Sequence, residues 1–96
     1  MQLKMMQTMT TSSIPTLDLY YFDACPYCQK VMGTIKKNNI KVNYKDIYED
    51  TNNLQKLIYI TGRKTVPCLF IDGDPMHESR DIVVWLEKNL DRLEKN

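Results

Sequence analysis

The sequence predicts an α/β fold in which a four-stranded mixed sheet is flanked by three helices, in the order β-α-β-α-β-β-α. Three observations support this prediction. The chain has 96 residues, which is enough for one compact domain and too few for two. Apolar residues recur with the period of a strand and then of a helix, in alternation along the chain. Proline, glycine and capping signals separate these segments.

The first half of the chain has the pattern of a strand, a helix and a second strand. Residues 17–22 form a short apolar and aromatic run that is typical of a buried strand. A helix is expected to begin at Cys25-Pro26, because proline suits the first helical position, and to end near residues 38–39. Apolar and polar residues then alternate over 41–47, which indicates a strand. The three segments make a βαβ unit, whose crossover should be right-handed.

The second half predicts a helix, a β-hairpin and a final helix. A helix over 50–61 is closed by a glycine, and an apolar strand over 66–71 follows. The turn at 72–75 returns the chain as a short antiparallel strand at 76–77, and Ser79 is a good N-cap for the last helix. This order of elements is that of the thioredoxin-like architecture. The positions expected to face the core are Leu54, Leu57, Ile58 and Thr61 in the first of these helices and Ile82, Val83, Leu86, Leu90 and Leu93 in the last.

The first residues of the chain lack the strand and helix periodicities of apolar residues that the rest of the chain shows. Residues 1–13 are polar and rich in Thr, Ser and Gln, and they lack the apolar core of roughly 7–15 residues that a secretory signal requires. We interpret residues 1–14 as a flexible N-terminal extension, with a cryptic targeting segment as the alternative, and residues 15–96 as the domain. Because no secretory signal is recognised, we expect a cytoplasmic protein.

The composition excludes several classes of partner. Lys and Arg number 13 against 12 Asp and Glu, which leaves a formal charge of +1, so the basic footprint that holds nucleic acid or a membrane surface is missing. No apolar run approaches the ~18–20 residues of a transmembrane helix. Three cysteines are an odd number, which argues against a fully paired disulfide scaffold. We therefore expect neither nucleic-acid nor membrane binding.

The chemistry concentrates at Cys25-Pro26-Tyr27-Cys28. A thiol attacks a disulfide only as the thiolate, and Cys25 lies at the expected N-terminus of a helix, where free N–H groups and the helix dipole favour an anion. Cys28 lies three positions further on and can reach its sulfur, so the spacing permits a reversible 25–28 disulfide. A cysteine pair at a strand-to-helix turn is typical of a thioredoxin-like redox site.

A metal site and a structural pair are the two other interpretations of this motif. A zinc site would need two further ligands, and only Cys68 and His77 are available, with no second Cys-x-x-Cys or His-x-x-x-His motif. The pair could also be structural. Motif and context together favour redox chemistry, and we expect no metal. Cys68 is expected to be a small buried hydrophobe, with slow regulatory oxidation as the alternative, and His77 an edge-strand residue.

Over residues 17–93 the chain resembles glutaredoxins, and two motifs carry the resemblance. They are Cys-Pro-Tyr-Cys at 25–28 and Thr-Val-Pro at 65–67, the latter followed by Leu-Phe-Ile-Asp-Gly at 69–73. The resemblance implies that Pro67 is cis and faces the cysteines. It also implies that the backbone of Val66 pairs with the cysteinyl part of glutathione, as an extended peptide adds to a free edge.

The resemblance implies further glutathione contacts. Tyr27 either lines the glutathione groove or covers the end of the sheet, and Arg63 and Lys64 either neutralise the glycine carboxylate or form a solvated loop pair. Glu78-Ser79 is similar to the γ-glutamyl-binding step of glutathione transferases and of glutaredoxins that resemble them. Ser79 at a helix N-terminus suits a carboxylate.

Two segments depart from the common glutaredoxin pattern. Many members have Gly-Gly-x-Asp-Asp before the last helix, whereas residues 77–81 read His-Glu-Ser-Arg-Asp. Asp81 matches one of the two acids and is a candidate glutathione contact or a surface charge, and Arg80 replaces the other acid. Many members also have a lysine three residues before the first cysteine, whereas this chain has Phe22 followed by Asp23, an acid that opposes thiolate formation.

The activity implied by the resemblance is glutathione-dependent reduction of protein disulfides and of protein–glutathione mixed disulfides. Cys25 is the expected nucleophile, Cys28 the resolving thiol, and the two form the redox disulfide. Glutathione is a cosubstrate in this exchange, and no bound cofactor is expected. The expected partners are glutathione and disulfide-containing or glutathionylated proteins, with ribonucleotide reductase as one candidate, and the protein is expected to be a monomer.

Three alternative functions stay open at this point. They are a thioredoxin-like reductase served by a flavoprotein, a dimer bridged by an iron–sulfur cluster on Cys25 and glutathione, and a glutathione-binding domain without enzymatic activity. The Thr-Val-Pro and Glu-Ser motifs argue against the first. Pro26 argues against the second, because cluster-binding relatives usually lack it. The third would resemble the N-terminal half of a glutathione transferase, although both cysteines are present here.

Overall fold

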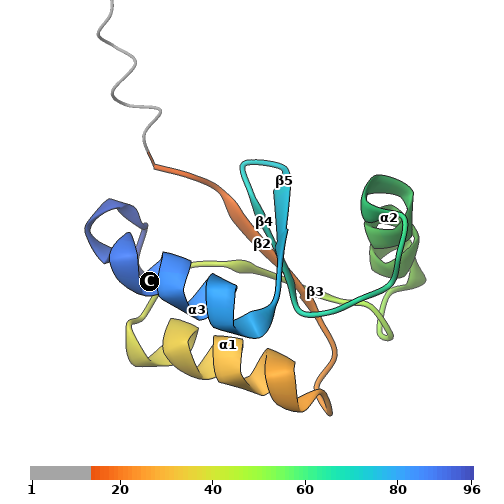
Figure 1. Cartoon of the computed structure of the whole chain (residues 1–96), viewed down its shortest axis with the longest axis horizontal. Helices are drawn as coiled ribbons and strands as arrows, with labels where there is room; N and C mark the ends of the chain where they lie inside the picture. The colour runs from red at the N-terminus through yellow and green to blue at the C-terminus, as the bar shows by residue number, and fades with distance from the viewer. Residues whose placement is uncertain (1–13) are drawn as a thin grey trace, which may run out of the picture.

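The computed structural model describes residues 14–96 and has the predicted order of elements (Figure 1). The predicted flexible extension, residues 1–14, lies outside the described residues except for its last position. Between residues 14 and 96, no helix is both long and apolar enough to cross a membrane. The elements in chain order are β2 (Leu17–Tyr21), α1 (Pro26–Lys37), β3 (Asn43–Asp46), α2 (Thr51–Thr61), β4 (Cys68–Ile71), β5 (Asp74–His77), α3 (Ser79–Lys88) and the 3-10 turn η2 (Leu90–Arg92).

The four strands form one mixed sheet in the order β3-β2-β4-β5. Strand β2 runs parallel to β3, as a βαβ unit requires, and antiparallel to β4, which pairs with β5 across a tight turn. The register sets Tyr20 opposite Cys68 on one side of β4 and Cys68 opposite His77 on the other. The predicted mixed sheet is therefore confirmed.

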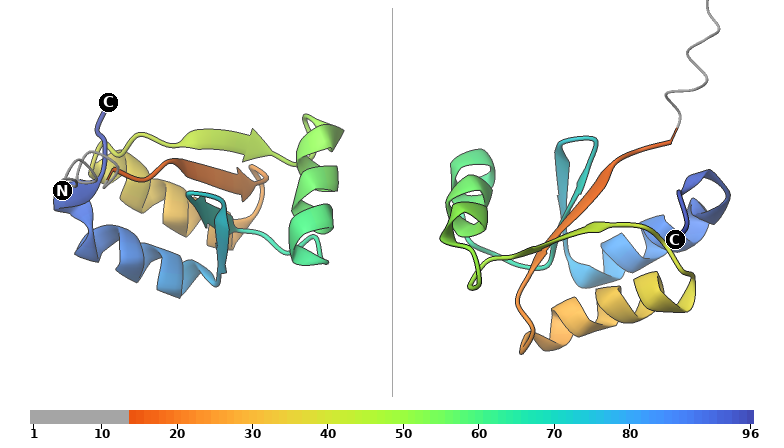
Figure 2. Two further views of the ribbon diagram at one scale, coloured as in Figure 1. Left: turned by 90° about the horizontal axis from the view of Figure 1, so that it is seen from above. Right: turned by 180° about the vertical axis from the view of Figure 1, so that it is seen from behind.

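Side chains at alternate strand positions build two separate cores, one on each face of the sheet. Leu19 and Leu69 point to the face covered by α1 and α3, which lie side by side (Figure 2). Tyr20 and Phe70 point to the other face with their ring centroids 4.8 Å apart, and α2 packs there through Leu57. The sheet thus separates the paired helices α1 and α3 from α2.

Helix α2 is more exposed than the sequence predicts. Leu57 is fully buried, whereas Ile58, which was predicted to face the core, is 41% exposed. This prediction is wrong because α2 contacts the sheet mainly along β3, so that it buries only a narrow stripe. The ends of the helix follow ordinary capping, with the carboxylate of Asp50 accepting from the Asn52 N–H at 2.9 Å and Gly62 closing the helix at φ 79°.

The final helix is shorter than the sequence predicts. Helix α3 ends before Asn89, and Leu90 lies in the separate turn η2. The side-chain amide of Asn89 donates to the Trp85 carbonyl at 2.8 Å, and such a local side-chain bond competes with continuation of the helix. Leu93 is nonetheless buried, as predicted.

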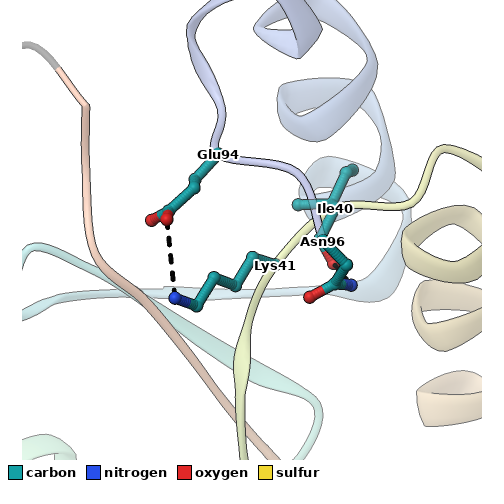
Figure 3. Close-up of polar contacts among 4 residues, drawn as sticks. All are labelled: Ile40, Lys41, Glu94 and Asn96. Carbon is teal, nitrogen blue, oxygen red and sulfur yellow. Dashed lines mark hydrogen bonds and ion pairs between the residues drawn. The ribbon is translucent and has the colours of Figure 1, made fainter.

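The segment that follows α1 pairs with the last residues of the chain, and we call this pairing the C-terminal clip (Figure 3). The Lys41 N–H donates to the Glu94 carbonyl at 2.9 Å, and the Asn96 N–H donates to the Asn39 carbonyl at 3.0 Å. The Lys41 ammonium also lies 3.4 Å from the Glu94 carboxylate. The clip therefore ties together the segments that follow α1 and α3.

Candidate active site

Cys25 precedes α1 and is itself the N-cap of that helix. Its backbone is extended (φ −79°, ψ 116°), and its Sγ accepts a hydrogen bond from the Cys28 N–H at 3.2 Å. Pro26 follows at the start of the helix, as predicted. The sulfur takes the place of the usual capping oxygen, next to an N–H donor and at the positive end of the helix dipole. The geometry suits Cys25 as a nucleophile.

Cys28 lies one turn further along α1, on its buried side. Burial, followed by the hydrogen bond with Cys25, raises the pKa of the Cys28 thiol to about 12. The thiol therefore keeps its proton at neutral pH. Both cysteines belong to the core between the sheet and the helices α1 and α3, and both are free thiols. The pair thus combines a sulfur at the N-terminus of α1 with a second, protonated thiol one turn further along the helix.

The Val66-Pro67 peptide bond is cis, as the glutaredoxin resemblance implies. Strand β4 begins only at Cys68, later than predicted, because Pro67 has no N–H to give to the ladder. Within residues 14–96 the backbone N–H and C=O of Val66 make no hydrogen bond. The Val66 side chain packs on the core cluster that contains Cys25 and Cys28. An extended ligand could pair with the free Val66 backbone groups close to the cysteines.

The start of α3 differs from the prediction. Ser79 is the first helical residue, and Glu78 occupies the N-cap position with a positive φ of 74°. This conformation is rare for a residue other than glycine, and a pattern of residue types does not reveal it. No side chain caps this end, and in the described part of the chain the N–H groups of Ser79, Arg80 and Asp81 have no hydrogen-bond partner. Free donors at a helix N-terminus can bind a carboxylate.

A groove of about 400 Å³ lies between the start of α1, the cis-proline loop and the start of α3, and we call it the Tyr27–Ser79 groove. It brings together five predicted glutathione contacts from three separate parts of the sequence. It adds Thr65, the first residue of the Thr-Val-Pro motif, which was not a predicted contact. The residues that line the groove are Tyr27, Thr65, Val66, Pro67, Glu78 and Ser79.

Three predicted glutathione contacts do not line this groove. The Nη2 atom of Arg63 lies 3.3 Å from the Nδ1 atom of His77, so the guanidinium reaches the edge strand β5. Lys64 and Asp81 are exposed outside the groove lining. A contact between any of these three side chains and glutathione stays a prediction.

Cys68 and His77 lie opposite each other on β4 and β5, across the sheet from Cys25. Cys68 is fully buried, as predicted, and burial raises the pKa of its thiol to about 11. His77 is half-buried on the edge strand, where burial and then the charge of Arg63 lower the pKa of its imidazole. Among the residues from 14 to 96, no three His, Cys, Asp or Glu side chains group as metal ligands.

Comparison with known proteins identifies the type of domain. Residues 19–92 match the family model described as the glutathione S-transferase N-terminal domain. The chain is 26% identical over 92 residues to a protein of Acanthamoeba polyphaga mimivirus named probable glutaredoxin. That alignment covers 84% of this chain and 87% of the viral protein.

Solved structures confirm the thioredoxin-like fold. A glutathione transferase homolog from Drosophila mojavensis, solved with bound glutathione, superposes with a TM-score of 0.69 at 20% identity and covers 80% of this chain. Wheat glutaredoxin superposes with a TM-score of 0.63 at 20% identity, over 83% of each chain. The chain therefore spans 36% of the transferase homolog and most of the glutaredoxin.

Proposed function

Because the chain belongs to the family of glutathione S-transferase N-terminal domains and has a glutaredoxin among its relatives, we propose that it is a glutathione-dependent thiol–disulfide oxidoreductase of the glutaredoxin type. One observation carries the proposal. The sulfur of Cys25 caps α1, while the free backbone of Val66 and the uncapped start of α3 leave hydrogen-bonding groups available nearby. Glutathione has a thiol, a peptide and two carboxylates that match such a set of groups.

Glutathione is proposed to bind in the Tyr27–Ser79 groove. Its cysteinyl backbone would pair with the free N–H and C=O of Val66, in the manner of an added strand. Its γ-glutamyl carboxylate would accept hydrogen bonds from the first N–H groups of α3 and from the Ser79 hydroxyl. Tyr27 would form a wall of the groove. The glutathione bound to the Drosophila mojavensis homolog supports this choice of ligand.

The proposed reaction on a glutathionylated protein has two exchanges. The Cys25 thiolate attacks the glutathione sulfur, the bond between that sulfur and the protein breaks, and the electron pair leaves with the protein thiolate, which takes up a proton. The thiolate of a second glutathione then attacks the glutathione sulfur bound to Cys25. Oxidised glutathione forms and the Cys25 thiolate is regenerated.

The proposed route for a protein disulfide also uses Cys28. Attack by Cys25 joins it to one sulfur of the substrate and releases the other as a thiol. Cys28 then loses its proton, attacks Cys25 and releases the reduced protein, which leaves a 25–28 disulfide that two glutathiones reduce. We propose the cytoplasm as the place of this activity, because its thiol pool keeps such a pair reduced.

The test is a glutathione-coupled assay on the mixed disulfide of glutathione and cysteine. We expect Cys25→Ser to lose at least about a hundredfold in rate, since the nucleophile is gone, and Cys28→Ser to keep most of the activity. Cys68→Ala is the matched control, because it removes a thiol on the other face of the sheet. Full activity in Cys25→Ser, or a wild-type protein without turnover, would contradict the proposal.

A second candidate function is glutathione binding without exchange, and the match to a transferase N-terminal domain favours it. Calorimetric titration with the thiol-blocked compound S-methylglutathione separates the two functions. Tight binding by a wild-type protein that shows no turnover would support the second function.

A further inference from the structure

A second groove lies between α1 and α3, directly beside the Tyr27–Ser79 groove. Its volume is about 400 Å³, and Ser79 lines both grooves. The two helices lie side by side and begin at the same end of the molecule (Figures 1 and 2). We call this second groove the α1–α3 groove, and its lining residues are Lys30, Thr34, Ser79, Arg80, Val83 and Val84.

The lining of the α1–α3 groove combines aliphatic surface with positive charge. Val83 is half-buried and Val84 is 42% exposed, so the α3 wall offers apolar contact. Lys30 comes from the α1 wall and Arg80 from the α3 wall. Within residues 14–96 neither cation forms an ion pair with a carboxylate, and the ion pair of this part joins Lys41 to Glu94.

The net positive charge of α1 adds to the positive charge of the α1–α3 groove. The helix carries Lys30, Lys36 and Lys37 and no acidic residue along its whole length. The Lys30 ammonium also lies 5.9 Å from the centre of the Tyr27 ring, next to the Tyr27–Ser79 groove. An occupant that complements the α1–α3 groove therefore carries acidic groups together with aliphatic side chains.

We propose that the α1–α3 groove binds the polypeptide segment of the substrate protein beside its glutathionylated cysteine, and that it selects segments with acidic and aliphatic side chains. This inference rests on the proposed function. When the glutathione half of the mixed disulfide fills the Tyr27–Ser79 groove, the protein half must continue elsewhere from the shared sulfur–sulfur bond. The α1–α3 groove begins where the first groove ends, at Ser79, and can receive it.

The test compares two short glutathionylated peptides that share leucines around the cysteine and differ only in flanking aspartates or lysines. We expect the wild-type protein to prefer the acidic peptide in kcat/KM. Lys30→Glu should lower the ratio of acidic to basic kcat/KM by roughly tenfold, because an attraction becomes a repulsion. Lys37→Glu is the matched control: it makes the same charge change on the same helix, outside the groove, and should leave the ratio within about twofold.

A second variant tests the groove in the opposite direction. Thr34→Lys adds a cation to the lining and should raise the ratio by about two- to threefold. The ratio cancels any effect on the glutathione half, which both peptides share. Equal kcat/KM for the two peptides, or an equal fall with Lys30→Glu and Lys37→Glu, would overturn the inference.

The mixed disulfide of glutathione and cysteine keeps this test distinct from that of the proposed function. It lacks a polypeptide segment, so Lys30→Glu should change its turnover by less than about twofold if the groove binds protein. A loss on this small substrate equal to the loss on the acidic peptide would assign Lys30 to glutathione and overturn the inference. If the wild type did not turn over the small substrate, the proposed function would fail. Fluorescence anisotropy with the reduced, dye-labelled peptides would then test whether the α1–α3 groove prefers the acidic peptide. Equal affinities for the two peptides would overturn the inference.

Discussion

Helices α1 and α3 begin at the same end of the molecule, yet their N-termini are completed differently (Figure 1). At α1 the cap is the sulfur of Cys25, which accepts the Cys28 N–H at 3.2 Å. At α3 the cap position belongs to Glu78, which offers no side-chain hydrogen bond and has a φ of 74°. One helix thus directs an N–H donor of its first turn to a side chain, and within residues 14–96 the other leaves its first donors free.

The difference shows how one structural device can supply two functions. The positive end of a helix stabilises negative charge wherever that charge comes from. At α1 the charge would be the attacking thiolate of Cys25, held by the chain itself. At α3 it would be a carboxylate of the ligand, so the helix start has to remain uncapped until the ligand arrives. The absence of a cap at α3 is then a functional feature that leaves part of the helix unsatisfied in the free protein.

The largest expected effect concerns the two thiols at α1. Because the pKa of Cys28 is raised to about 12, its thiolate fraction at about pH 9 is roughly a thousandth, whereas an unperturbed thiol is about half ionised there. We expect iodoacetamide to label Cys25 first, and the rate at Cys28 to keep rising by about tenfold per pH unit above pH 9. Tandem mass spectrometry locates each label.

Cys68 serves as an internal control in the same experiment. The pKa of its thiol is raised to about 11, so its labelling rate should level off at lower pH than that of Cys28. Equal labelling of Cys25 and Cys28 near neutral pH would contradict the division of roles at α1.

The next effect concerns the start of α3. Ser79→Asp places a carboxylate at the free N–H groups, which should raise KM for glutathione by about a hundredfold through repulsion of the ligand carboxylate. The same change should stabilise the fold by about 0.5 kcal/mol, because an acidic side chain suits the first turn of a helix. Ser79→Ala, which removes only the hydroxyl, should raise KM by about tenfold. Steady-state kinetics and urea unfolding measure the two quantities.

This pair of changes tests whether the uncapped end is kept for a ligand. A more stable protein that binds glutathione less well is the expected outcome for Ser79→Asp. If Ser79→Asp left KM at the wild-type value, the carboxylate site at α3 would be wrong, whatever happened to stability.

The two helix starts also differ in how far the sequence reveals them. At α1 the signal is local, since Cys25 and Pro26 are the cap and the first helical residue and both are legible as residue types. At α3 the chain enters the helix through a positive φ at Glu78, which no residue preference announces. The predicted N-cap, Ser79, therefore lies one residue after the observed N-cap, Glu78.

Other differences from the prediction depend on tertiary contacts. The periodicity of α2 identified Leu57 correctly but not the exposure of Ile58, because the width of a buried stripe depends on how much of the sheet the helix touches. The guanidinium of Arg63 reaches His77 on β5, a partner 14 positions away that local patterns do not indicate, and its contact with glutathione stays a prediction. The order of elements and the cysteine motif needed only local patterns, so they were predictable.

The third expected effect concerns the backbone at Glu78. Glycine adopts a φ of 74° without the steric cost of a side chain, so Glu78→Gly should stabilise the fold by about 0.5–1 kcal/mol. Asp72→Gly is the matched control at a φ of 50°. The Asp72 carboxylate accepts the Thr16 N–H at 2.8 Å, so that substitution should destabilise the fold. Urea unfolding compares the two, and a loss of stability in Glu78→Gly would mean that the positive φ carries no cost.

The smallest expected effect concerns the other ends of the same two helices, where the C-terminal clip joins the segments that follow α1 and α3 (Figure 3). The Lys41 ammonium lies 3.4 Å from the Glu94 carboxylate, and both side chains are more than half exposed. Lys41→Ala should therefore lower the unfolding free energy by only about 0–1 kcal/mol, and most of this difference should disappear in high salt. The backbone hydrogen bond between the same two residues survives the substitution and should hold the clip closed. The relative position of the two helix starts should then be unchanged, and KM for glutathione should stay within about twofold of wild type. A large rise in KM with Lys41→Ala would mean that the two N-termini depend on the ion pair for their alignment, and that their division of roles is not fixed by the packing of α1 against α3.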